Sequence, residues 1–372
     1  MSTRLDRLSR RRVLAWLAAS GAGAALAPRR SWSQENSPAA GGVIDVHHHI
    51  YPPHYTRANL ARLLADAPLD PASTYLNWTP EQTIDEMDRN GVAAAVTSIT
   101  SPGIWFGNNA DGRHWARECN EYGARLASDH PGRFGMFAAI PLPDTSGSLH
   151  EIAYALDILK LDGIGLLTNY NGRYLGDAAF APVFDELNRR QAVVFVHPIL
   201  TSCCRTPPRP SAGQLGAAPA VNQPLDKLRP WAGPTDTTIT ITSLLYSGTL
   251  ARCPDIRFIF AHGGGTLPMV INRINGNAAH GFTPERRAEI MPHGLTFEVQ
   301  KLYFDIAGVI NNPAALAADW KMAPMSQFMF GSDHPFGPLT QTSLLEKLDL
   351  PADALAVLRR DNALRLFPRF NV

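Results

Sequence analysis

The sequence predicts a single α/β domain folded as a (β/α)8 (TIM) barrel, and three observations lead to this prediction. Short apolar runs recur along the chain, segments with helix signals separate them, and there are eight such runs. Near-continuous apolar strands alternating with helices indicate a parallel sheet that is covered on its outer face. Eight is the strand number of the barrel, and a doubly wound open sheet is the competing topology. The runs are 43–47, 93–99, 134–140, 163–168, 193–197, 256–262, 302–307 and 327–333.

Two of the intervening segments carry helix start signals. Thr79 is a good N-cap residue, Pro80 follows it at the first helical position, and Gly91 is typical of a residue just past a helix end. Ser148 and Glu151 have the spacing of a capping box. We therefore expect one helix to start at Pro80 and another just after Ser148.

The first 33 residues have the pattern of an export signal, and we expect the barrel domain to occupy 34–372. A run of arginines at 10–12 precedes the apolar stretch 13–27. That stretch is shorter than the about 20 residues of a membrane span and suits a signal segment. It resembles a twin-arginine signal, which the export machinery reads as an address and which does not act as an anchor. We therefore expect a periplasmic or secreted protein without stable membrane insertion.

The bulk composition excludes some functions and permits others. A hydrophobic content of 45% is enough for a sizeable core, and a net charge of +1 gives no electrostatic case for binding nucleic acid. Charged residues make up 18% of the chain, below the usual value of about 25%, which is compatible with an oligomer interface. The segment 203–224, rich in Pro, Gly and Ala, follows the fifth run. We expect a loop that closes over the barrel mouth, with a decorative insertion as the alternative.

Four of the eight apolar runs end in side chains that can bind a metal ion or move a proton. In a barrel of this class, the ends of the strands form the active-site face. Residues i and i+2 of an extended segment project to the same side, so His47 and His49 can hold one ion while His48 turns away. The residues at the run ends are His47, His49, His197, His262, Asp333 and His334.

This donor set predicts a mononuclear metal site. Neutral imidazoles and one carboxylate suit zinc with a position left open for water or substrate, and manganese or iron are the alternatives. His262 is expected to act as acid and base, and a role as fifth ligand is the competing interpretation. Asp305, near the end of the seventh run, is expected either to orient a ligand or to bond the barrel wall. The expected ligands are His47, His49, His197 and Asp333.

At these residues the chain resembles the amidohydrolase superfamily, in particular the amidohydrolase 2 branch that includes aminocarboxymuconate-semialdehyde decarboxylase. The matching motifs keep their order along almost the whole length after residue 33. They are "IDVHHHIYPP", "MDRNGV", "RFGMFAAIPLPD", "VVFVHP", "LARCPDIRFIFAHGGGTLPMVINRI", "FGSDHPF" and "DNALRLF". The resemblance implies a distorted (β/α)8 barrel, the same four metal ligands, and a catalytic role for His262.

The resemblance also implies a homodimer and a class of substrate. In the muconate enzyme, an arginine eleven residues after the catalytic histidine reaches the neighbouring subunit's substrate carboxylate, and here that position is Arg273. This chain lacks the muconate enzyme's arginine ahead of Trp78, and it has His334 where that enzyme has tyrosine. With these departures, and with "DTT" at 236–238 and "YSGTL" at 246–250, the chain is more similar to the 6-methylsalicylate-decarboxylase-like members.

We therefore expect a metal-dependent, non-oxidative decarboxylase that acts on a 2-hydroxybenzoate or a related small carboxylic acid and releases CO2. Asp333 or His262 would supply the proton, and Arg273 and His334 would contact the substrate. The alternative is a hydrolase of a lactone, ester or amide that uses a metal-bound water. A periplasmic metal- or ligand-binding protein is the third interpretation, because barrels serve many functions.

Overall fold

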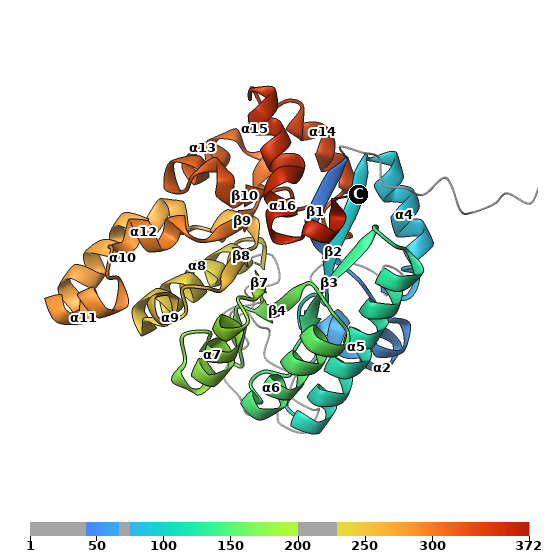
Figure 1. Ribbon diagram of the computed structural model, residues 1–372, viewed down its shortest axis with the longest axis horizontal. Helices are drawn as coiled ribbons and strands as arrows, with labels where there is room; N and C mark the ends of the chain where they lie inside the picture. Colours follow the sequence, from blue (N-terminus) through green and yellow to red (C-terminus); the bar gives the residue numbers. More distant parts are fainter. Residues whose placement is uncertain (1–41, 67–74, 200–228, 372) are drawn as a thin grey trace, which may run out of the picture. The chain divides into compact units, whose positions relative to one another are not determined.

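The computed structural model describes residues 42–66, 75–199 and 229–371, and its eight main strands form one sheet that curves into a nearly closed barrel (Figure 1). The strand order is β1-β2-β3-β4-β7-β8-β9-β10, and every neighbouring pair is parallel. Each of the eight predicted runs contributes one strand, so the (β/α)8 prediction is confirmed. The predicted signal 1–33 and the predicted lid 203–224 lie outside the described residues.

The strands are short and almost wholly buried, which explains why their sequences are apolar without strict alternation. A two-stranded antiparallel ribbon, β5 and β6, follows β4. The strands are β1 (Val43–His49), β2 (Val92–Ser98), β3 (Phe134–Ala139), β4 (Gly163–Leu167), β5 (Asn169–Tyr170), β6 (Arg173–Tyr174), β7 (Val193–His197), β8 (Arg257–Phe260), β9 (Tyr303–Asp305) and β10 (Phe328–Met329).

Backbone hydrogen bonds between β1 and the chain after β10 close the barrel. The Val46 amide donates to the Phe330 carbonyl at 3.0 Å, and the Asp333 amide donates to the His47 carbonyl at 2.8 Å. The run predicted over 327–333 is thus a regular strand only at its start. Its remainder is an irregular segment that pairs with β1, because Asp333 has a left-handed backbone that a strand does not accommodate.

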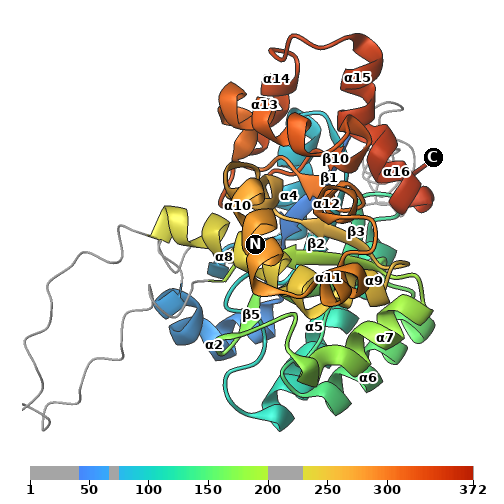
Figure 2. The ribbon, with the colours of Figure 1, turned by 90° about the vertical axis from the view of Figure 1, so that its left-hand side faces the viewer.

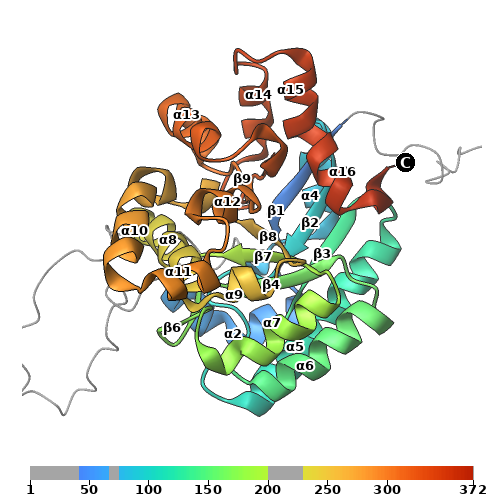
Figure 3. The same cartoon turned by 60° about the vertical axis from the view of Figure 1, so that its left-hand side comes forward.

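Helices surround the strands, as the two rotated views show (Figures 2 and 3). In the described part of the chain, none of the helices combines the length and apolar character needed to cross a membrane. The α-helices are α2 (Pro53–Asp66), α4 (Pro80–Arg89), α5 (Asn109–Asp129), α6 (Thr145–Ala153), α7 (Ala181–Arg189), α8 (Arg229–Ser247), α9 (Thr249–Arg252), α10 (Leu267–Gly281), α11 (Pro284–Ile290), α12 (Leu295–Gln300), α13 (Pro313–Met322), α14 (Thr342–Leu345), α15 (Ala352–Ala356) and α16 (Asn362–Leu366).

The barrel interior is filled with apolar side chains and is not a channel. Strand residues including Val46, Phe137 and Phe195 form one cluster with Phe367 and Phe370 near the C-terminus. Phe137 stacks on Phe195 and meets Phe367 edge-on. The C-terminal rings of Phe367 and Phe370 are therefore part of the apolar core of the barrel.

The structure confirms one helix-start prediction and corrects the other. The Thr79 hydroxyl accepts from the Gln82 amide, and α4 begins at Pro80. The capping box at Ser148 is wrong, because α6 begins at Thr145 and Asp144 caps it by accepting from the Gly147 amide. A carboxylate that lies earlier in the chain takes the capping role, while Glu151 instead binds side chains of α5.

Candidate metal centre and adjoining cavity

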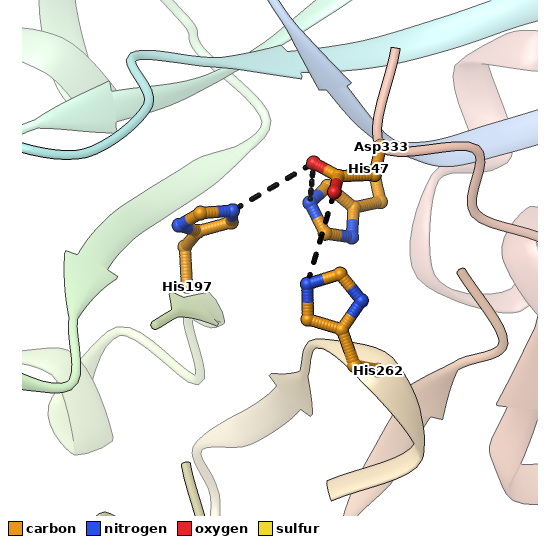
Figure 4. Close-up of side chains that lie close together, drawn as sticks. All are labelled: His47, His197, His262 and Asp333. Carbon is orange, nitrogen blue, oxygen red and sulfur yellow. Dashed lines mark ion pairs between the residues drawn. The ribbon is translucent and has the colours of Figure 1, made fainter. Parts of the chain in front are cut away.

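The histidines and the aspartate predicted as site residues come together at the end of the barrel where the strands terminate. His47 and His49 lie on β1, and His197 is the last residue of β7. His262 opens a short turn after β8, and Asp333 lies four residues after the end of β10. Figure 4 shows three of these imidazoles directed at the Asp333 carboxylate.

The distances within this group suit atoms that share one ion. Asp333 Oδ1 lies 3.0 Å from His49 Nε2, 3.1 Å from His47 Nε2 and 3.8 Å from His197 Nε2. Asp333 Oδ2 lies 3.9 Å from His262 Nε2. Two atoms that bind the same metal ion, each at about 2.0–2.2 Å from it, lie about 3–4 Å from one another. One ligand atom each from His47, His197, His262 and Asp333 lies within 4.8 Å of all the others.

The chemistry of the donors also fits a divalent cation. Both ring nitrogens of His197 and Nε2 of His47 are buried, and within the described residues none of them makes a hydrogen bond. Buried polar atoms without a partner are costly and call for an explanation. A metal ion accepts such imidazole lone pairs, so the arrangement indicates a divalent metal site.

Burial and nearby charge shift the pKa values of these imidazoles in different directions. Burial lowers the pKa of His49 to about 4 and that of His197 to about 3, so both rings are neutral and can donate lone pairs at neutral pH. Burial also disfavours charge on His47, but Asp305 and Asp333 outweigh it and raise the pKa of His47 to about 10. Two carboxylates that favour a proton on this ring will also favour a cation bound in its place.

Asp305 fulfils both roles that the sequence left open. Its Oδ2 lies 3.0 Å from His47 Nδ1, which orients that ring with Nε2 towards the centre. Its Oδ1 accepts from the backbone amides of His262 and Ala307. His262 in turn places Nδ1 3.1 Å from the Ala307 carbonyl, so its Nε2 is also left to face the centre.

Local backbone irregularities aim these side chains. The register of β1 against β2 shifts between Asp45 and His48, and such a shift re-aims the side chains of a strand. His262 and Asp333 both have positive φ values, of 57° and 62°. Gly265 follows with φ 75°, and a β-carbon there would lie 1.9 Å from the Pro234 carbonyl oxygen. The glycines after His262 therefore form a sharp turn that requires glycine at position 265.

A cavity of about 510 Å³ adjoins the centre, with His197 and Ser98 in its wall. Ser98 also positions a predicted ligand, because its Oγ lies 3.0 Å from His49 Nδ1. Arg62 of α2 contributes a guanidinium to the wall. Most of the remaining described wall is apolar or aromatic, including Ile104, Phe106, Phe137, Leu167, Phe195 and Ile199.

Two predicted substrate residues lie elsewhere in the described subunit. Arg273 is exposed on α10, and His334 is buried and stacks on His48 at a ring-centroid distance of 4.6 Å. Neither belongs to the described wall of the cavity. Sequence reasoning missed Arg62 and Ser98. Ser98 had a usable signal, because it lies one residue before the end of the second apolar run, 93–99. Nothing in the helix of Arg62 indicates which way its side chain points.

Comparison with known proteins agrees with this geometry. The family model described as amidohydrolase matches residues 44–369. A decarboxylase of Penicillium terrestre is 36% identical over 343 residues, which cover 88% of this chain and 96% of that protein. A 6-methylsalicylic acid decarboxylase of Penicillium expansum is 35% identical over 342 residues, which cover 88% of this chain and 96% of that protein.

A solved structure shows the same fold. It is a dihydroxybenzoic acid decarboxylase of Polaromonas with bound manganese and an inhibitor, and it matches with a TM-score of 0.72 and 18% identity over 88% of this chain and 97% of that chain. The family model spans most of the chain, and the two fungal relatives exceed 30% identity over nearly their whole length. The chain therefore belongs to the amidohydrolase family, as its motifs predicted.

Proposed function

We propose that this protein is a metal-dependent, non-oxidative decarboxylase of a 2-hydroxybenzoate-type acid. The observation that carries the proposal is the direct contact between a metal-binding cluster and a largely apolar cavity of about 510 Å³. Such a cavity can hold an aromatic ring while the cluster takes its acidic end. The decarboxylase names of the two fungal relatives support the reaction, and one of those names supports a 6-methylsalicylate-like substrate.

His47, His49, His197 and Asp333 would hold the metal ion. When bound there, the ion supplies positive charge that orients the substrate's carboxylate and neighbouring phenolate and offsets their negative charge. We propose zinc, because imidazoles dominate the donor set. Manganese, the ion in the Polaromonas structure, is the alternative, and reconstitution with each ion separates the two.

The chain's own residues must supply a proton, because loss of CO2 leaves an electron pair on the ring carbon. We propose that His262 Nε2 holds this proton and delivers it to that carbon. The contact of its Nδ1 with the Ala307 carbonyl keeps the ring orientation fixed. Positioned proton transfer of this kind contributes about 10²–10⁴-fold to a rate. Asp333, whose Oδ2 lies 3.9 Å from His262 Nε2, is the alternative donor.

Phe137, Phe195 and Ile199 would bind the ring and exclude water from the reacting carbon. A dry site strengthens the attraction between the charged groups and the substrate's acid. Arg62 would hold a negatively charged or polar group of the substrate, or attract the acid into the cavity.

The decisive experiment measures CO2 release from 6-methylsalicylate and a panel of 2-hydroxybenzoates. The purified protein is loaded with zinc or with manganese, and a chelated sample serves as the control. Metal-dependent release from at least one acid is the expected result. No release from any acid, together with turnover of an aryl ester or a lactone, would make the protein a hydrolase.

We further propose export by the twin-arginine machinery to the periplasm or the exterior, and a homodimer. The arginine run at 10–12 ahead of the apolar stretch supports export. The exposure of Arg273 on α10 leaves it accessible to a second subunit's site. Cell fractionation with and without an Arg11→Lys, Arg12→Lys change tests export. Light scattering tests the dimer, and a raised KM in Arg273→Ala would support the role of this arginine across the interface.

A further inference from the structure

The middle histidine of the "HHH" run is part of a buried polar cluster behind the metal centre. This cluster consists of Asp45, His48, Ser332 and His334, and none of the four is more than 7% exposed. His48 is not one of the four side chains whose ligand atoms lie close enough to share an ion, here called the metal group: His47, His197, His262 and Asp333. Its ring stacks on His334 with an interplanar angle of 29°. Two members of the cluster, His48 and Ser332, both bond to the carboxylate of a third, Asp45.

The Asp45 carboxylate accepts four hydrogen bonds, two on each oxygen. Oδ1 accepts from the backbone amides of His47 and Ser332, both at 3.0 Å. Oδ2 lies 3.0 Å from His48 Nδ1 and accepts from Ser332 Oγ at 2.6 Å. This one side chain therefore connects β1 with a segment 287 residues later in the chain.

The hydrogen bonds around Asp45 restrain the backbone on both sides of Asp333. Ser332 and His334 flank Asp333, and Ser332 Oγ accepts from the His334 amide at 3.0 Å. The Asp333 amide donates to the His47 carbonyl, and the His49 amide donates to the His334 carbonyl, both at 2.8 Å. Asp333 is thus held on both sides while it adopts its left-handed φ of 62°. That conformation is unfavourable for a residue other than glycine and persists only when its surroundings enforce it.

We propose that Asp45, His48 and Ser332 form a clamp that positions the Asp333 carboxylate against His47 and His49. None of the three contacts the cavity or belongs to the metal group in the described structure, so they are positioning residues and not catalytic residues. The inference rests on the proposed metal centre, and it assigns the middle histidine a role that the ligand pattern leaves open.

Two variants separate the parts of the clamp. Ser332→Ala removes the hydroxyl that bonds both Asp45 and His334. His48→Phe removes the donor to Asp45 but keeps an aromatic ring that can stack on His334, so it tests the bond without emptying the core. Ser332→Thr restores a hydroxyl and serves as the rescue variant. Thr97→Val is the matched control. It removes the buried hydrogen bond from the Thr97 hydroxyl to the Gly135 carbonyl, and neither residue belongs to the clamp.

The primary readout is affinity for zinc or manganese, measured by competition with a chelator at a temperature where every variant is folded. The second readout is kcat at saturating metal. We expect Ser332→Ala and His48→Phe to bind the ion about 10–100-fold more weakly, as changes to groups that orient metal ligands generally do. Ser332→Thr should recover most of the affinity. Thr97→Val should lower Tm and leave the affinity unchanged.

Unchanged metal affinity and kcat in Ser332→Ala and His48→Phe, with only a lower Tm, would overturn the clamp and leave a purely structural cluster. If Ser332→Ala does not fold, His48→Phe alone decides, because its stacking ring is retained. A wild-type protein that binds neither ion would instead remove the proposed metal centre, and with it the basis of this inference. The two failures are therefore distinguishable.

Discussion

Asp305 Oδ2 lies 3.0 Å from His47 Nδ1, on the opposite side of the imidazole from the Asp333 carboxylate at its Nε2. The His47 ring is thus held between two carboxylates, one belonging to the metal group and one behind it. A histidine ligand held in this way keeps one tautomer and one orientation, and it is more basic. The strength of metal binding should therefore depend on a residue that does not bind the metal.

Asp305→Asn is expected to weaken metal binding about 10–100-fold, because the amide keeps the shape of the side chain and loses its charge. Chelator competition measures this change. Asp319→Asn is the control: Asp319 is also a buried carboxyl, and burial raises its pKa to about 8, so the amide resembles its neutral form at pH 7. Equal affinities in the two variants would contradict the role of Asp305.

The metal-free protein should lose stability as the pH falls below about 6.5. Burial lowers the pKa of His197 and of His334 to about 3, whereas in the unfolded chain these rings take up protons near 6.5. The unfolded state then binds more protons than the folded state, so the free energy of unfolding falls by at most about 1.4 kcal/mol per pH unit for each ring. Denaturant titrations of chelated protein between pH 4.5 and 7 measure this slope. His197→Phe should reduce it, and an equal slope in that variant would contradict the assignment.

His47 should produce the opposite dependence at alkaline pH. Although burial disfavours its charge, Asp305 and Asp333 raise the pKa of His47 to about 10, above its unfolded value near 6.5. The stability gained from its proton is complete below pH 6.5 and is lost as the pH rises towards 10. The metal-free protein should therefore be most stable near pH 6.5. A stability that keeps rising up to pH 9 in the same titrations would count against this interpretation.

Chelation should lower Tm by several degrees, and adding back the ion should restore it. An ion present at 100 times its dissociation constant stabilises the folded state by about 2.7 kcal/mol. The matched variant Asp333→Ala lacks the carboxylate at the middle of the group, and its Tm should be insensitive to the chelator. If chelation lowers the Tm of that variant as much as it lowers the wild-type Tm, the ion is bound elsewhere.

His262→Asn separates proton transfer from metal binding. We expect kcat at saturating metal to fall by about 10²–10⁴-fold, as loss of a positioned proton donor would cause. Metal affinity should stay close to that of the wild type, because the four proposed ligands remain. Loss of the ion in this variant, measured by metal analysis after dialysis, would show instead that His262 is a ligand. The position of the His262 ring close to His47, His197 and Asp333 also supports that alternative.

Arg62→Gln should raise KM for acidic substrates by up to about fivefold and leave kcat nearly unchanged. The contact would join the acid group of the substrate to the exposed Arg62 guanidinium, and an exposed ion pair typically contributes about 0.2–1 kcal/mol to binding. Arg62 lies over the Phe106 ring at 4.6 Å, so Arg62→Lys keeps the charge while changing this stacking. Steady-state kinetics of the three proteins on one acid measure the effect, and an unchanged KM in Arg62→Gln would exclude a contact with substrate.

The sequence by itself determined the eight strands, the family and the six candidate residues at the strand ends. These features are local: an apolar run specifies a buried strand, and the place where it ends specifies which face of a parallel barrel its last residue joins. The alternation within "HHH" likewise placed His47 and His49 on the side of the metal group and turned His48 away.

Only the tertiary structure decided how these residues are held. Asp45 meets Ser332, and His47 meets Asp305, across 287 and 258 positions of the chain. A periodic pattern in the sequence cannot indicate such contacts, because they form only when the barrel folds and closes between β1 and the segment after β10. The left-handed backbone of Asp333 and the direction of Arg62 into the cavity have the same origin. Local pattern therefore placed the metal-site histidines and Asp333 at the strand ends, whereas folding of the barrel decided which other residues line the cavity and the geometry with which all of them meet.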